Sequence, residues 1–225
     1  MVPESAGQYA RFDAPACSSA IGVSAQLGDA IETRIRAVEK ASGVEVGKDG
    51  CKPDLHLLIV DDGLSAIATL RQRHKRAFGK MQPYLRDRLE RGEGPAYHWR
   101  VVFPLSSDDN VNCATPGSFG GGHETYGLIN DDAMNAARTQ IKSRNLLPLR
   151  QAINHAFVLI ERESMIGLSA VQIADFAAMR SLVRASENNE ALDEIETILS
   201  LFENDAVRKE RPTLSQWDLA LLKSL

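Results

Sequence analysis

The stretch LHLLIVDDG, at residues 55–63, decides the fold. Its first six residues are apolar except for His56, and the two acids and the glycine that follow are typical of a turn, so it predicts a short buried strand. Apolar residues at helical spacing precede it, from a cap at Ser24 to a terminating Gly43, and follow it over residues 65–78. The order helix, strand, helix predicts that helices cover a central sheet.

The C-terminal half carries equally clear signals. AFVLI at residues 156–160 indicates a second buried strand, and the alternating run at 97–105 indicates a third. Ser169, with Gln172 three residues later, forms a capping box before an apolar stripe that predicts a helix as far as Val183. Further helices are expected at residues 84–90, at 192–202 and from Ser215 onward.

These elements predict an α+β or mixed α/β fold, in which a small central sheet is flanked by several helices. A chain of 225 residues, 44% hydrophobic and 25% charged, can bury one continuous core, and it fits one large domain better than two. We expect an extended N-terminal segment at residues 1–15 and a single α/β domain at 16–225. The longest apolar runs are far shorter than a membrane helix requires, so no transmembrane segment is expected.

The charge balance argues against nucleic acid as a partner. The net charge is −4, whereas binding to phosphate backbones depends mainly on clustered Lys and Arg. One basic stretch, at residues 71–80, lies within the helix expected at 65–78 and just beyond it. It is interpreted as a solvated helix face, with an anionic partner as the alternative.

Cys17, Cys51 and Cys113 leave the redox state open. Cys17 and Cys51 each lie at the start of a segment, where a disulfide could tie neighbouring strand ends, but two reduced thiols of a cytosolic protein fit equally well. No Cys-x-x-Cys pair is present, which excludes zinc-ribbon and thioredoxin-type sites. The first residues show no signal peptide, which suits either a cytosolic protein or an exported one without its leader.

The histidines do not form a metal motif. A zincin needs His-Glu-x-x-His on one helix, and His123-Glu124 has Gly127 at the second histidine position, after three glycines. No metal and no cofactor are therefore expected. His56 is interpreted as a buried core histidine. A hydrolytic site is an alternative only if the tertiary structure assembles dispersed residues, for which the candidates are His155, Asp175 and His123.

Gln172 and Asp175 are the candidate ligand-binding residues. If the helix that begins near Ser169 lines a cleft, an amide beside a carboxylate could bind a polar ligand or transfer a proton. The competing interpretation of Asp175 is an acid near the helix start that complements the helix dipole.

Several short motifs carry a family resemblance. GLSAVQIADFAAMR at residues 167–180, ILSLF at 198–202, LSQWD at 214–218, and Cys17 with GCKPDL at 50–55 resemble an uncharacterised exported protein family of alphaproteobacteria. More distantly, the order of elements is similar to a domain of unknown function grouped with zincin-like peptidases. In the helix that matches the metal motif, this chain has Gln172 and Asp175 and no histidine.

The resemblance implies several properties at once. It implies a degenerate zincin-like scaffold that has lost its metal, and export to the periplasm or the outside of the cell, with a cytoplasmic location as the alternative. Export favours a disulfide between Cys17 and Cys51. We therefore expect a non-catalytic exported domain that binds a protein or a cell-envelope component. The alternative remains the hydrolase with a dispersed site.

Overall fold

The protein has a mixed α/β fold built on one curled sheet. The computed structural model describes residues 10–79, 81, 83–92, 94–106, 149–183, 197–203 and 213–224. Within these residues the sheet has five strands, β1 (Arg11–Phe12), β2 (Ser18–Ile21), β3 (Leu55–Val60), β4 (Ala96–Ser106) and β5 (Leu149–Glu161). The predicted fold class is confirmed.

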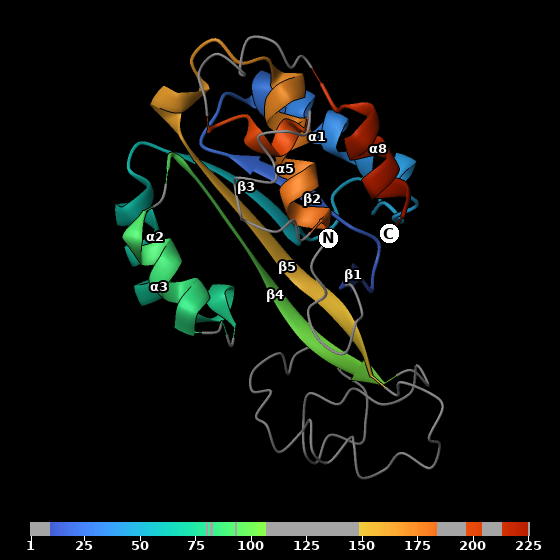
Figure 1. The fold of residues 1–225 in the computed structure, drawn as a ribbon, viewed down its shortest axis with the longest axis horizontal. Helices are drawn as coiled ribbons and strands as arrows, with labels where there is room; N and C mark the ends of the chain where they lie inside the picture. Colours follow the sequence, from blue (N-terminus) through green and yellow to red (C-terminus); the bar gives the residue numbers. More distant parts are fainter. Residues whose placement is uncertain are drawn as a thin grey trace.

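The long strand β5 organises the sheet. Along one side it pairs in parallel with β1 through its first half and with β3 through its second half, and β2 continues the parallel part beyond β3. Along its other side it pairs with β4, which runs antiparallel to it. Figure 1 shows β4 and β5 crossing the whole molecule as a long pair. Because β2, β3 and β5 run in the same direction, their C-terminal ends lie together along one side of the sheet, which we call its carboxyl edge.

One face of the sheet packs against four helical elements. They are α1 (Ala25–Ala41), α5 (Ala170–Leu182), the short η3 (Ile198–Ser200) and α8 (Gln216–Lys223), which lie together in Figure 1. Strand periodicity explains the packing, because Leu55, Leu57 and Ile59 alternate toward this face and all three are buried. With α1 and α5 they form the main hydrophobic core.

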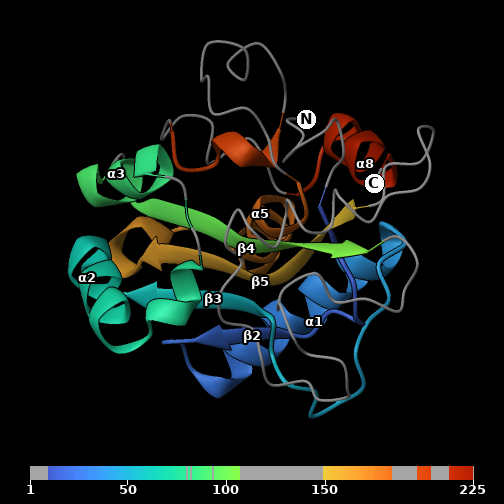
Figure 2. The ribbon, with the colours of Figure 1, turned by 90° about the horizontal axis from the view of Figure 1, so that it is seen from below.

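The opposite face carries a smaller, more aromatic core. It is covered by α2 (Gly63–Arg73), η1 (Lys75–Phe78) and α3 (Pro83–Arg91), which lie on the far side of the sheet from α1 in Figure 2. Phe78, Trp99 and Phe157 stack in sequence, with ring centroids 5.1 and 4.9 Å apart. The ring of His56 continues this stack at 4.8 Å from Phe157.

The local predictions and the structure agree best where caps are present. The strand at 55–60 is confirmed, as are the capping boxes at Ser169 with Gln172 and at Ser215 with Asp218. The single helix predicted at 65–78 is wrong, because the chain leaves helical geometry at His74 and continues as η1. The basic residues that it carries, Arg71, Arg73, Lys75 and Arg76, are exposed, as expected of a solvated face.

Two strands, β1 and β2, were not predicted from the sequence. Arg11–Phe12 and Ser18–Ile21 are too short and too polar to show strand periodicity, and both depend on their neighbours for pairing. β1 also shows that part of the expected N-terminal segment belongs to the sheet. Of the helix predicted at 192–202, only residues 197–202 are described, and they form η3 and a turn. None of the described helices is both long and apolar enough to cross a bilayer.

Candidate functional site

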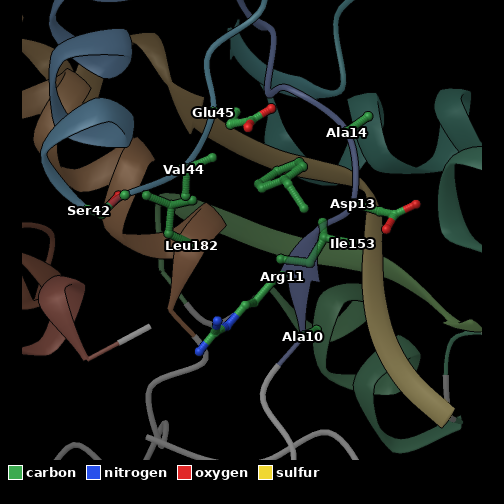
Figure 3. A pocket seen from close by; sticks show the side chains of 11 residues that line it. Ala10, Arg11, Asp13, Ala14, Ser42, Val44, Glu45, Ile153 and Leu182 are labelled. Carbon is green, nitrogen blue, oxygen red and sulfur yellow. The ribbon is translucent and has the colours of Figure 1, made fainter. Parts of the chain in front are cut away.

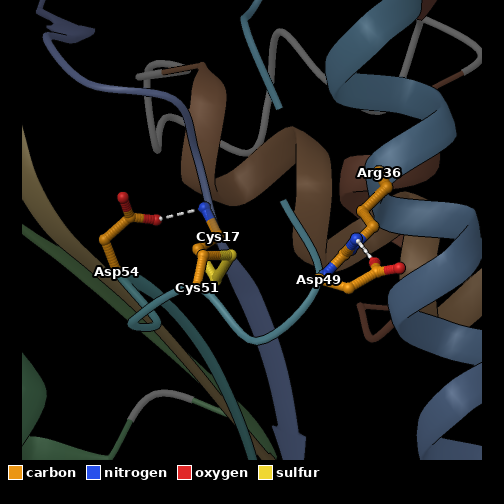
Figure 4. Close-up of a disulfide and its surroundings, with 5 residues drawn as sticks. All are labelled: Cys17, Arg36, Asp49, Cys51 and Asp54. Carbon is orange, nitrogen blue, oxygen red and sulfur yellow. Dashed lines mark hydrogen bonds and ion pairs between the residues drawn. A yellow bond between two sulfur atoms is a disulfide. The ribbon is translucent and has the colours of Figure 1, made fainter. Parts of the chain in front are cut away.

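A disulfide joins Cys17 to Cys51. Cys17 lies just before β2 and Cys51 lies in the turn before β3, with Cα atoms 6.0 Å apart (Figure 4). The backbone N–H of Cys17 also donates to Asp54 Oδ1 at 2.8 Å, so two bonds hold the entry points of the two strands together. The predicted pairing is confirmed.

Asp54, which bonds Cys17, and its neighbour Glu39 both have raised pKa values. Glu39 of α1 is fully buried, and neither of its carboxylate oxygens has a hydrogen-bond partner among the described residues. Burial, followed by the neighbouring Asp54, raises the pKa of Glu39 to about 7, although Arg36 opposes the shift. Burial likewise raises the pKa of Asp54 to about 6. The two acids can therefore be neutral in mildly acidic solution.

Asp175 is an internal anchor of the main core. Its side chain is fully buried and accepts from Arg34 through both carboxylate oxygens, at 2.7 and 3.0 Å. The hydroxyl of Thr213 and the backbone N–H of Leu214 donate to the same carboxylate, at 2.7 and 3.1 Å. Asp175 thus fixes α5 to α1 and to the segment before α8.

The helix-dipole interpretation of Asp175 is wrong. α5 begins at Ala170, so Asp175 lies beyond the first turn, which contains no acid. Gln172 completes the capping box by accepting from the backbone N–H of Ser169 at 3.0 Å, and it is buried. Both candidate ligand-binding residues therefore make bonds that hold α5 in place, and their role in binding a ligand stays a prediction.

His155 lies on the opposite face of the sheet from Asp175. It contacts His56, with 3.3 Å between His56 Nε2 and His155 Nδ1, and its ring lies against Phe157 of the aromatic core. Asp175 faces α1 on the other side of the sheet, so the structure does not bring the two candidate catalytic residues together. The third candidate, His123, lies outside the described residues, as do the triple glycine and Cys113.

The loops at the carboxyl edge of the sheet converge on Arg162, in the short helix η2 (Arg162–Met165) that follows β5. Its guanidinium donates to Asp61 after β3, at 2.7 Å, and to the carbonyl of Gly22 after β2, at 3.0 Å. Three apolar side chains at this edge are exposed: Ile21 at the end of β2, at 57%, Leu64 in the first turn of α2, at 43%, and Ile166 after η2, at 79%. We call Ile21, Leu64 and Ile166, with the Arg162–Asp61 pair, the carboxyl-edge surface.

A separate small cavity lies between β1 and the turn that follows α1 (Figure 3). It encloses about 190 Å³ and is lined partly by the charged side chains of Arg11, Asp13 and Glu45 and partly by apolar groups such as Ile153 and Leu182. Small-molecule sites commonly enclose about 300 to 1,000 Å³. This cavity is smaller than such a site.

The sequence did not predict the contact between His56 and His155 or the carboxyl-edge surface. His56 and His155 are 99 positions apart, and no local spacing links them. The carboxyl-edge surface depends on the order of β2, β3 and β5 in the sheet. The sequence DDG at residues 61–63 indicates the loop after β3, but no comparable motif indicates the loops after β2 and β5.

No protein-family model, curated protein or solved structure matches this chain. Among the described residues, no three His, Cys, Asp or Glu side chains are grouped so that they could hold a metal ion. The zincin-like resemblance therefore stays a prediction.

Proposed function

We propose that the protein is a non-catalytic exported domain that binds a protein component of the cell envelope through its carboxyl-edge surface. The observation that carries this proposal is the exposure of Ile21, Leu64 and Ile166 at the edge where the loops after β2, β3 and β5 converge. Exposed apolar side chains rimmed by charged groups are typical of protein–protein contacts. Ligands of parallel α/β sheets also bind at the carboxyl ends of the strands.

The charges of this surface favour a protein over a lipid membrane. Arg162 and Asp61 are exposed and carry opposite charges, and the whole chain has a net charge of −4. Anionic bilayers attract clusters of Lys and Arg, which this surface lacks in its described residues. A protein surface with apolar and paired charged groups matches it better.

Export is supported by the disulfide between Cys17 and Cys51, because such bonds persist mainly in oxidising compartments. The proposal that the domain is non-catalytic is supported by Asp175 and Gln172, because the hydrogen bonds of both side chains serve the fold. Asp175 uses both oxygens to hold Arg34 and two further donors, and Gln172 caps its own helix.

The compartment is tested by trapping free thiols in cells of the native host. With Cys113 replaced by Ser, an exported protein has no thiol that reacts with a maleimide until a reductant is added. Two reactive thiols in untreated cells, at Cys17 and Cys51, would place the protein in a reducing compartment and contradict export.

The binding surface is tested with a photo-crosslinking residue in the native host. Placed at Ile166, it is expected to give one discrete protein adduct in the envelope fraction, and placed at Leu219, an exposed residue of α8, none. The adduct should disappear when Ile21 or Leu64 is replaced by Asp and persist with Leu219→Asp. An adduct that is unaffected by Ile21→Asp, an adduct with lipid, or no adduct at residue 166 would each refute the proposed surface.

A further inference from the structure

The pair of His56 and His155 stands apart from the proposed binding surface and from the main core. His56 lies in β3 opposite Phe157 of β5, and His155 lies two residues before Phe157. Side chains two positions apart on a strand point to the same face, so the two imidazoles are diagonal neighbours on the face that also carries the aromatic core. Both are half-buried, and their ring centroids are 5.4 Å apart.

The surrounding sheet holds both rings in place. The β3–β5 ladder is continuous from Leu55 with Ala156 to Val60 with Glu161, and the ring of Phe157 stacks on His56 at an angle of 18°. On its other side, His155 pairs with Val101 of β4, directly beside the bulge between Val101 and Val102. Strand pairing and ring stacking therefore hold the facing nitrogens, Nε2 of His56 and Nδ1 of His155, close together.

The hydrogen bond between the two rings already leaves a lone pair on one of the facing nitrogens. One N–H is shared between Nε2 of His56 and Nδ1 of His155, so one ring donates and the other accepts. The donating ring can carry its proton on its other nitrogen instead, and both facing nitrogens then have a lone pair.

The distance between these nitrogens matches two ligands of one metal ion. A tetrahedral ion with metal–nitrogen bonds of about 2.0–2.1 Å separates two of its nitrogen ligands by roughly 3.3–3.4 Å. The observed distance is 3.3 Å. Imidazole nitrogens are preferred ligands of divalent copper, zinc and nickel.

We infer that His56 and His155 together bind a divalent first-row transition-metal ion, through Nε2 of His56 and Nδ1 of His155. Water fills the remaining positions on the ion. Ser19 is the β2 neighbour of His56 on the same face, and its buried Oγ has no hydrogen-bond partner among the described residues. This hydroxyl can bond to a metal-bound water. The positive charge of Lys52 acts on His155 and opposes binding, so we expect dissociation constants in the micromolar range.

Binding of Cu²⁺ and Zn²⁺ to the whole purified chain is the first test. Isothermal titration should show one ion of either metal per chain, and His56→Gln and His155→Gln should each weaken binding at least tenfold. His74→Gln removes an exposed histidine at the end of α2 and should leave the affinity unchanged. Equal affinity in all four proteins would overturn the inference, as would a tenfold loss in His74→Gln.

A second measurement needs no variant and remains decisive if a substitution impairs folding. Pulsed electron paramagnetic resonance of the Cu²⁺-loaded wild-type protein counts the imidazoles bound to the ion. Two equatorial imidazoles are expected at one equivalent of Cu²⁺. One imidazole, or none, would show that the pair is only a hydrogen bond. Neither outcome bears on the carboxyl-edge surface, whose crosslinking test does not involve these residues.

Discussion

Two buried carboxyl groups of this protein have opposite surroundings. Asp175 accepts four hydrogen bonds, two of them from a guanidinium, whereas neither oxygen of Glu39 has a partner among the described residues. A buried charge is tolerated when it is paired and is costly when it is not. The hydrogen bonds of Asp175 therefore hold the fold together, whereas the ionised form of Glu39 destabilises it.

Glu39→Gln should stabilise the protein in alkaline solution. The pKa of Glu39 rises from its ordinary 4.5 to about 7 on folding, so the folded state binds more protons between these values and loses stability as the pH rises through them. The neutral amide avoids this loss. We expect urea denaturation to show a gain of the order of 2–3 kcal/mol at pH 8 and little gain at pH 4. A gain of the same size at both pH values would contradict this account.

Asp175→Asn should destabilise the protein strongly. The amide keeps the shape of the side chain but lacks the negative charge that pairs with Arg34. Breaking a buried pair by removing one partner costs about 3 kcal/mol or somewhat more. The control is Asp61→Asn, which breaks the exposed pair with Arg162 and should change the urea midpoint little. If both variants have the same midpoint, Asp175 is no anchor.

At the scale of whole elements, two helical glycines have opposite roles. Gly63 begins α2, where an added Cβ would lie 2.2 Å from the ring of Tyr97 and 2.9 Å from Glu161 Oε1. The Gly63 N–H also donates to the same Oε1 at 3.0 Å, so α2 reaches the sheet only because this residue lacks a side chain. Gly28 in α1 has room, since the nearest atom to an added Cβ lies at 3.6 Å.

Substituting each glycine by alanine should therefore give opposite results. Gly28→Ala should stabilise the protein by about 0.5–1 kcal/mol, because alanine restricts the unfolded chain and favours the helix. Gly63→Ala should lower the melting temperature, since α2 must move away from Tyr97. Thermal unfolding followed by circular dichroism measures both. A stabilised Gly63→Ala variant would show that α2 does not pack as closely as described.

At the scale of the molecule, the two cores share β5. Ala156, Val158 and Ile160 face the main core, and Phe157 and Leu159 face the aromatic core, so one strand belongs to both. A shared strand couples the two cores, which is what a single domain requires. The expectation of one domain over residues 16–225 can be tested through this coupling.

The two tryptophans of the chain report on the two cores separately. Trp99 is buried in the aromatic core, and Trp217 of α8 packs against the main core. Fluorescence of Trp99→Phe and Trp217→Phe variants should therefore show urea transitions that coincide with circular dichroism in each variant, as two-state unfolding requires. Separate midpoints for fluorescence and circular dichroism within one variant would indicate that the cores unfold independently.

Local signals determined the elements of this protein, and long-range contacts determined its sites. The strand at 55–60, the caps at Ser24, Ser169 and Ser215, and the fold class could be predicted, because caps and periodicity act within a few residues. The positions of Cys17 and Cys51 allow a disulfide, but their spacing does not decide between oxidised and reduced forms.

The tertiary structure alone decided which side chains meet. Strand pairing placed His56 beside His155, 99 positions away, and the packing of α1 against α5 placed Arg34 beside Asp175, 141 positions away. It also formed β1 and β2, which are too short to be stable without partner strands. The physical reason is that strand pairing and side-chain contacts depend on how distant segments bury their surfaces together, and no pattern within a few residues records that.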